Sequence, residues 1–256
     1  MPSRVIYADS ADKIPSAPVD GLPTLVYWAT CNLAQPIRYA LECVGVDFVD
    51  VRVHWGPAEP TAAEGMHTPG YKGMWKERKV ELAKTQLFPN VPYFMEQHPT
   101  LGDVHLVQST AILRFIGRKK PSLMGGTLAH MCDMVLDQAI DLDWAMMDVQ
   151  YDDWASATRW CTEKLPDMLA RWDRLLGEKK LMVSDDLTIA DLKAYECFRK
   201  IKLMEADPAV ATSTFASFPR LCGFVERVES EEPIKRYMSS PQYIARPLNT
   251  AHAQWK

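Results

Sequence analysis

The chain has 256 residues, enough for one large or two small domains, and its composition of 47% apolar and 24% charged residues is that of an ordinary globular protein. The net charge of −4 gives no electrostatic reason to expect a nucleic acid or an anionic membrane surface as a partner. The six cysteines include no CxxC pair and no Cys/His cluster, so we expect no metal site and a reducing compartment.

Neither a membrane anchor nor a secretory leader is expected. No apolar run reaches the ~18 residues that span a bilayer. The first 22 residues lack the long apolar core of a signal peptide, so we expect a cytoplasmic protein. Residues 1–22 are mixed in composition and contain three prolines, and we predict that they form a loosely ordered N-terminal extension.

The first predicted elements form a β-α-β unit. Residues 24–28 are a short apolar run rich in β-formers, residues 33–45 place apolar side chains at helical spacing, and residues 47–54 alternate as a strand does. Such a unit implies two parallel strands with a right-handed crossover. The turn at 29–32 would aim side chains and backbone N–H groups into one crevice.

A Pro/Gly-rich loop at 55–70 separates this unit from a polar helix at about 71–85, and loops of this length are usually functional or disordered. A strand is predicted directly after Pro92, because proline is tolerated at the first residue of a strand. Residues 96–103 are expected to turn the chain into a short second strand at 104–107.

A helix over 110–120, with Ser109 as its N-cap, completes the first half. The predicted order is β-α-β-α-β-β-α, which is the thioredoxin-like arrangement. The boundary between this domain and the second half of the chain is expected near 121–127.

The second half is predicted to be all-α. Its helices are expected at 128–151, 154–177, 189–204, 217–229 and 233–239. Pro166 should kink the second of them or mark an irregular turn. Thr188 and Asp191 have the spacing of a capping box ahead of the third.

This domain order and several local motifs resemble the mu class of glutathione S-transferases. The segment VYWATCNLAQPIRYALE is similar to that class's motif of Tyr-Trp, four residues, Leu-Ala and a helix that carries an arginine. The matching residues are Tyr27, Trp28, Leu33, Ala34 and Arg38. Further stretches resemble the class in the same order: FPNVPY (88–93), QSTAILRFIGRK (108–119), LTIADLKAYE (187–196) and ARP…QW (245–255).

The resemblance covers roughly residues 22–256. It implies a thioredoxin-like domain at 23–120 that binds glutathione, and an all-α domain at 128–256 that holds an electrophile site. It also implies a glutathione transferase, acting as a homodimer without a metal, that conjugates glutathione as co-substrate to small hydrophobic electrophiles.

The resemblance makes Tyr27 the expected catalytic residue. A simple thiol has a pKa of about 8.5 to 9, so little thiolate exists at neutral pH. A phenol that donates a hydrogen bond to the sulfur would stabilise the thiolate, and each unit of pKa shift is worth ~1.4 kcal/mol. Taken alone, Tyr27 would more readily be interpreted as a tyrosine packed at a strand end, but the surrounding pattern favours the catalytic role.

The same resemblance suggests how the tripeptide is held. Gln108 and Ser109, at a helix N-terminus, would bind the γ-glutamyl carboxylate, which is compatible with a capping role for Ser109. In Asn90-Val91-Pro92, a cis-proline would expose the backbone of Val91 for strand-like pairing with the cysteinyl part.

Other positions are implied less directly. Trp28 and Leu33 belong to the motif beside the bound glutathione, and Trp75 and Lys79 match a pair that reaches its glycyl end. The alternative is a solvated helix face, which would be the better interpretation for Lys79 taken alone. Asp141 matches a carboxylate that the partner subunit contributes to the γ-glutamyl ammonium. It could instead be one exposed acid among several on its helix: Asp133, Asp137 and Asp143 lie nearby.

Two aromatic residues complete the expectations from the family. Tyr151 corresponds to a second tyrosine that some members place over the electrophile. Phe88 resembles an aromatic key that inserts between helices of the other subunit, which favours a homodimer.

Cys31 departs from the mu pattern. Thiol-type relatives carry a nucleophilic cysteine at this position, so a thiol transferase or glutathione-dependent reductase that uses Cys31 is an alternative function. The sequence favours a buried structural cysteine, because Asn32 and not proline follows it. A non-enzymatic ligand-binding member of the fold, and an isomerase that uses glutathione as a cofactor, are further alternatives.

Overall fold

The computed structural model describes residues 4–54, 73–84, 86–250 and 253–256. Contacts divide the chain into two compact units. The first comprises Met1–Leu113, Arg236–Gln254 and Lys256, and the second comprises Arg114–Lys235 and Trp255. The units differ from the expected domains because most of the C-terminal tail belongs with the first one. The segment 55–70, for which we predicted a loop, lies outside the described residues.

The first unit is built on a mixed, five-stranded sheet in the order β1-β3-β2-β4-β5. Its strands are β1 (Arg4–Ala8), β2 (Thr24–Trp28), β3 (Val49–Val53), β4 (Tyr93–His98) and β5 (Gly102–Val107). β1 and β2 both run parallel to β3, whereas β4 is antiparallel to β2 and β5 is antiparallel to β4. The predicted β-α-β unit and hairpin are therefore confirmed.

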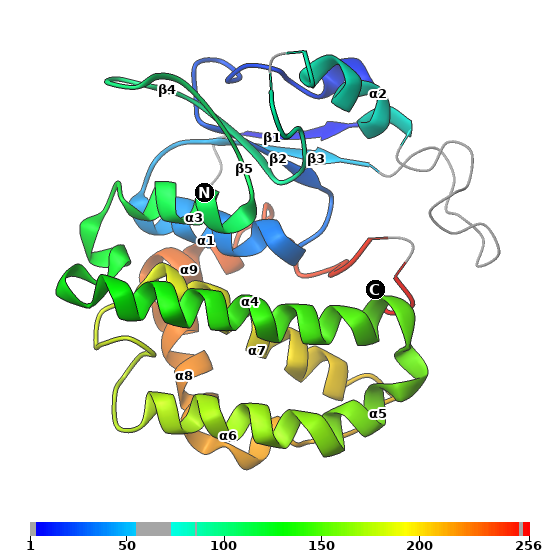
Figure 1. Ribbon diagram of the computed structural model, residues 1–256, viewed down its shortest axis with the longest axis vertical. Helices are drawn as coiled ribbons and strands as arrows, with labels where there is room; N and C mark the ends of the chain where they lie inside the picture. Colours follow the sequence, from blue (N-terminus) through cyan, green and yellow to red (C-terminus); the bar gives the residue numbers. More distant parts are fainter. Residues whose placement is uncertain (1–3, 55–72, 85, 251–252) are drawn as a thin grey trace. The chain divides into compact units, whose positions relative to one another are not determined.

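Helices cover both faces of this sheet. They are α1 (Gln35–Val44), α2 (Gly73–Leu82) and α3 (Ser109–Gly117). Figure 1 shows α1 and the start of α3 on one face and α2 on the opposite face. Every residue of β2 and β3 is buried as a result, which suits central strands covered on both sides. α1 ends at Gly45, whose φ of +75° allows its N–H to donate to two carbonyls of the last turn.

The prediction that residues 1–22 are loosely ordered is wrong for Arg4–Ala8 and Ala11–Lys13, which form regular elements. Arg4–Ala8 form β1, an edge strand paired with β3 in register from Arg4 opposite Val49 to Ala8 opposite Val53. A short 3₁₀ helix follows at Ala11–Lys13 and contacts α2. The three prolines indicated a loosely ordered segment, but Val5-Ile6-Tyr7 is a run of β-formers that can add to an open sheet edge.

Two element boundaries also differ from expectation. The hairpin turn is shorter than 96–103, because β4 continues to His98 and β5 begins at Gly102. α3 begins at Ser109 itself, so the residue before the helix is Gln108, which has a φ of +71°.

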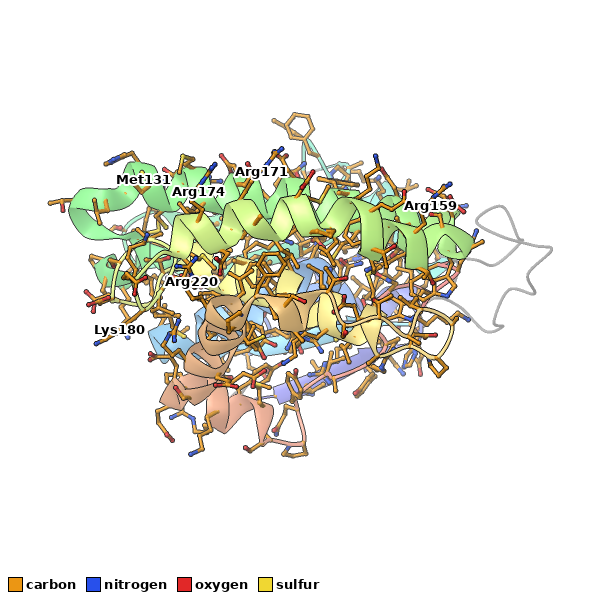
Figure 2. The ribbon with its side chains drawn as sticks, turned by 90° about the horizontal axis from the view of Figure 1, so that it is seen from below. Met131, Arg159, Arg171, Arg174, Lys180 and Arg220 are labelled. Carbon is orange, nitrogen blue, oxygen red and sulfur yellow. The ribbon has the colours of Figure 1, made fainter. Side chains whose placement is uncertain are left out.

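The described part of the second unit consists of helices and their connections. The elements are α4 (Ala129–Asp152), α5 (Ala157–Arg159), a π-helical segment (Trp160–Lys164), α6 (Leu165–Leu176), α7 (Ile189–Glu205) and α8 (Pro219–Ser230). A last helix, α9 (Glu232–Met238), leads into the tail. Figure 2 shows Arg159, Arg171 and Arg174 along the rod formed by α5, the π-helical segment and α6.

Both local predictions for this half are confirmed. The irregular π-helical turn ends just before Pro166, as expected where a proline cannot donate within a helix. Thr188 caps α7: its Oγ1 accepts from Asp191 N–H, and Asp191 Oδ2 accepts from Thr188 N–H at 2.8 Å. No described helix is both long and apolar enough to cross a membrane.

An ion cluster lies inside the second unit. Asp143 of α4 accepts from Lys200 Nζ of α7 at 2.8 Å and also contacts Lys193 Nζ. All three side chains are at most 4% exposed. Burial by itself would raise the pKa of Asp143, but the two ammonium groups lower it far below its usual value. The carboxylate therefore stays ionised inside the helical core.

Candidate functional site

The strand register brings three predicted segments to one end of the sheet of the first unit. Val26 of β2 lies opposite Tyr93 of β4, and Tyr93 lies opposite Val107 of β5. Tyr27 follows Val26, Pro92 precedes Tyr93, and Gln108 follows Val107. β2 therefore ends, β4 begins and β5 ends side by side, so residues from three separate stretches of sequence surround one place.

Tyr27 and Trp28 occupy the end of β2. Tyr27 is 3% exposed and lies opposite Arg52 of β3. The Trp28 ring meets the ring of Trp75 from α2 edge to face, with centroids 6.4 Å apart and an interplanar angle of 79°. Trp75 is also buried, so it belongs to the core beside Trp28 and not to a solvated helix face. Lys79, one turn later, is exposed.

The loop after β2 is held tightly by its surroundings. Cys31 is fully buried, its thiol donates to the carbonyl of Ile244 at 2.9 Å, and its N–H donates to the carbonyl of Pro247 at 3.1 Å. Asn32 has a φ of +29° and donates from Nδ2 to Oδ1 of Asn249 at 3.1 Å. A buried thiol that donates to a carbonyl presents no surface to an incoming disulfide.

A fully buried arginine fixes the same loop from the other side. Arg38 of α1 donates to the carbonyl of Thr30 at 2.9 Å and makes a bidentate pair with Asp50 of β3 at 3.0 and 3.2 Å. Burial would lower the pKa of Arg38, but Asp50 raises it, so the guanidinium stays charged. Arg52 donates to the same carboxylate at 2.8 Å.

The turn before β4 contains a cis peptide bond between Val91 and Pro92, as the resemblance implied. Pro92 is buried, Val91 is half-buried and Asn90 is exposed. The N–H of Val91 donates to Oδ1 of Asn90 at 3.0 Å, so the expected free N–H at this position is already engaged. Burial raises the pKa of the following Tyr93 to about 12, which keeps that phenol protonated.

The remaining residues of the first unit lie at accessible positions. Gln108 is exposed and Ser109 half-buried at the start of α3, where backbone N–H groups of the first turn have no partner within the helix. Leu33 is half-buried in the 3₁₀ turn before α1. Phe88 is 74% exposed in the segment ahead of the cis-proline, beside Leu87 at 89%.

On α4, in the second unit, the surroundings of Asp141 differ from those of its acidic neighbours. Asp133 and Asp137 pair with Arg114 at 2.7 and 2.8 Å, and Asp143 is buried with its two lysines, whereas Asp141 is exposed. Tyr151 is half-buried near the end of the same helix.

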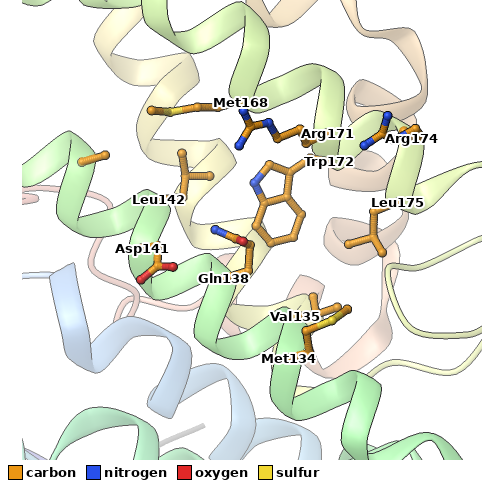
Figure 3. Close-up of a pocket in the computed structure, with 11 residues that line it drawn as sticks. Met134, Val135, Gln138, Asp141, Leu142, Met168, Arg171, Trp172, Arg174 and Leu175 are labelled. Atoms are coloured by element: carbon orange, nitrogen blue, oxygen red, sulfur yellow. The ribbon is translucent and has the colours of Figure 1, made fainter.

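A cavity of about 460 Å³ opens between α4 and α6, and sequence reasoning missed it. Figure 3 shows the lining side chains, with Asp141 and Gln138 on the α4 side and the Trp172 ring and Arg171 on the α6 side. Its lining is mostly apolar, from residues such as Met134, Val135, Leu142, Met168 and Leu175. The amphipathic stripes of both helices suggested core packing and gave no sign that they leave a gap.

Among the described residues, no group of three or more His, Cys, Asp or Glu side chains is arranged to hold a metal ion. At the sheet end, the groups that the described residues bring together are a phenol, a helix N-terminus, a cis-proline turn and two indole rings.

The chain is similar to proteins of known identity. A family model described as "Glutathione S-transferase, C-terminal domain" matches residues 140–241. The chain is 30% identical over 236 residues to "Glutathione S-transferase Mu 2" of Macaca fuscata fuscata, which covers 91% of this chain and 97% of the relative. It is also 30% identical over 240 residues to a "Glutathione S-transferase" of Dermatophagoides pteronyssinus, covering 91% of this chain and 96% of the relative.

Solved structures agree with these relatives in fold. The glutathione S-transferase Blo t 8 matches with a TM-score of 0.71 at 20% identity, covering 90% of this chain and 98% of that structure. The Pi-class glutathione S-transferase of Onchocerca volvulus matches with a TM-score of 0.67 at 23% identity, covering 91% and 99%. The predicted fold class, a thioredoxin-like domain followed by an all-α domain, is confirmed.

Proposed function

Because this chain belongs to the glutathione S-transferase family and resembles its mu class, we propose that it transfers the thiolate of glutathione to small hydrophobic electrophiles. In this proposal, Tyr27 stabilises the thiolate. The observation that carries the proposal is the register that gathers the end of β2, the start of β4 and the end of β5. Those three ends bear Tyr27, the cis-proline turn and the start of α3.

In the proposed reaction, glutathione loses its thiol proton to solvent while the Tyr27 hydroxyl donates a hydrogen bond to the sulfur. The thiolate then attacks the electrophilic carbon: a carbon–sulfur bond forms, and in a substitution the leaving group departs with its electron pair. Tyr27 is 3% exposed, and a hydrogen bond shielded from water stabilises charge more than one in water does. Holding both reactants together supplies the rest of the rate gain.

We assign the tripeptide to the surrounding residues of the first unit. Gln108, Ser109 and the first-turn N–H groups of α3 would receive the γ-glutamyl carboxylate. The Val91 backbone would pair with the cysteinyl part after displacing the Asn90 side chain from its N–H. Lys79 would receive the glycyl carboxylate, and Trp28, Leu33 and Trp75 would form the apolar wall beside it.

We further propose a homodimer in which Phe88 of one copy enters the cavity between α4 and α6 of the other. Phe88 is 74% exposed, and the cavity is mostly apolar with Trp172 in its lining. Burying one large aromatic side chain per copy, two in the dimer, stabilises the association. Asp141 lines this cavity, which would let it reach the partner's γ-glutamyl ammonium. We assign Tyr151 to the electrophile site, where its hydroxyl would donate a hydrogen bond to the electrophile.

The deciding experiment is a pH–rate profile of aryl-halide conjugation for the wild type, Tyr27→Phe and Cys31→Ser. The apparent pKa of the bound thiol should rise by about one unit or more in Tyr27→Phe, equivalent to ~1.4 kcal/mol or more. It should stay near the wild-type value in Cys31→Ser, because that thiol is buried and donates to Ile244. Loss of turnover in Cys31→Ser with an unchanged Tyr27→Phe profile would instead establish the thiol transferase.

A further inference from the structure

The loop between β2 and α1 is hydrogen-bonded to a segment that lies more than two hundred residues later in the sequence. The Cys31 thiol and the Ile244 carbonyl are separated by 213 positions, and the Asn32 and Asn249 side chains by 217. Cys31, Asn32 and Asn249 are at most 2% exposed, so these hydrogen bonds lie inside the first unit. The tail from Gln242 to Asn249 thus forms one wall of the loop that follows Tyr27.

A second connection runs from the tail through the sheet to the same loop. The carbonyl of Gln242 accepts from the guanidinium of Arg52, the β3 residue opposite Tyr27. Arg52 donates to Asp50, Asp50 accepts from Arg38, and Arg38 donates to the carbonyl of Thr30. Tail, strand, helix and loop are therefore joined in a continuous chain of polar contacts.

The loop needs such support because of its backbone. Asn32 has a φ of +29°, at the edge of the left-handed region that residues other than glycine occupy at a cost. Its amide must also be satisfied, since it is buried. The bond to Asn249 meets this need and holds the backbone just after Tyr27 in one conformation.

We propose that the tail segment Gln242–Asn249 positions the glutathione site, with the Asn32–Asn249 pair as its latch. The inference rests on the proposed role of Tyr27. A phenol that stabilises a thiolate acts through one directed hydrogen bond, and a displacement of about 1 Å can cost such a group as much as ~100-fold in rate. Asn249 is a positioning residue in this scheme and does not touch the sulfur.

The test is a double-mutant cycle of Asn32→Gly, Asn249→Ala and the double variant. Glycine tolerates the backbone of Asn32, so the first substitution removes the side chain, including its amide, without adding backbone strain. Four quantities are measured for each protein. The pH titration of the bound glutathione thiolate is monitored by ultraviolet absorbance, and kcat, KM for glutathione and the unfolding midpoint are measured beside it. Gln254→Ala, which removes an exposed amide of the tail outside the segment Gln242–Asn249, is the control.

A latch predicts that each single variant lowers kcat about threefold or more and shifts the thiolate titration upwards, with KM changed less. The loss in the double variant should be clearly smaller than the sum of the two single losses, because each single variant already removes the bond that the two side chains share. Additive effects, or a loss of stability with an unchanged titration, would overturn the inference. If Tyr27→Phe leaves the titration unchanged, the proposed function fails. If only the Asn variants leave it unchanged, the latch alone fails.

Discussion

Arg38 and Asp50 form a bidentate ion pair in which both side chains are 0% exposed, and the same guanidinium holds the carbonyl of Thr30. Asp50 also accepts from Arg52, so one carboxylate compensates two buried cations. A buried pair of this kind need not be more stable than apolar residues of the same volume, but removing one partner leaves charge uncompensated.

Asp50→Asn should therefore destabilise the protein by about 3–5 kcal/mol, measured as the free energy of unfolding in urea. The matched control is Asp20→Asn, which breaks a pair with Arg4 whose side chains are 57% and 66% exposed. That surface pair should contribute at most about 1 kcal/mol. Equal losses in the two variants would contradict the prediction that Asp50→Asn leaves uncompensated charge in the core.

The ion cluster of Asp143, Lys193 and Lys200 should give the stability a dependence on pH. A carboxylate with a depressed folded-state pKa contributes stability that is complete above its unfolded pKa of about 4 and is lost as the pH falls towards the folded value. Asp143→Asn should thus lower the free energy of unfolding by about 3–5 kcal/mol near pH 7, and the gap to the wild type should narrow below about pH 4.

Denaturant unfolding at a series of pH values measures this gap. Asp148→Asn, on an exposed position of the same helix, should follow the wild type within about 0.5 kcal/mol throughout. A gap for Asp143→Asn that stays constant down to strongly acidic pH would show that the carboxylate does not titrate as the cluster requires.

The capping box of α7 should be worth a measurable amount. Thr188→Ala removes the side chain that accepts from Asp191 N–H and donates to its carboxylate at 2.6 Å, so stability should fall by about 1 kcal/mol. Thermal or urea unfolding reports the loss, and Thr162→Ala on an exposed helical turn serves as the comparison. Because α7 is buried along nearly its whole length, no change would mean that packing alone determines where it begins.

The dimer proposal is tested from both of its sides. Phe88→Ala removes the aromatic side chain, and Ala145→Leu partly fills the cavity that would receive it. Each should raise the dimer dissociation constant about tenfold or more, since a fully buried aromatic is a common interface anchor. Sedimentation velocity at several concentrations measures the constant. Leu101→Ala, 66% exposed on the β4–β5 turn, should leave it unchanged, and a dimer unaffected by Phe88→Ala would contradict the assignment.

Local rules predicted much of this molecule because the physics concerned is local. The β2–α1–β3 unit, the amphipathic helices, the irregular turn before Pro166 and the Thr188 capping box all follow from spacing over a few residues. The same rules misjudged residues 1–22, because β1 is stable only against the edge of β3, and no local pattern shows that this edge is open.

By itself, the sequence determined the fold class, the family motifs and the segment that carries Tyr27. The tertiary structure decided how the residues around Tyr27 are supported. Trp75 is buried edge to face against Trp28 and does not lie on a solvated helix face. Cys31, a candidate nucleophile, is buried and donates to the carbonyl of Ile244. The reason is physical: burial and hydrogen-bond partners depend on chain segments that meet only after folding, and sequence spacing carries no information about a contact across 213 residues.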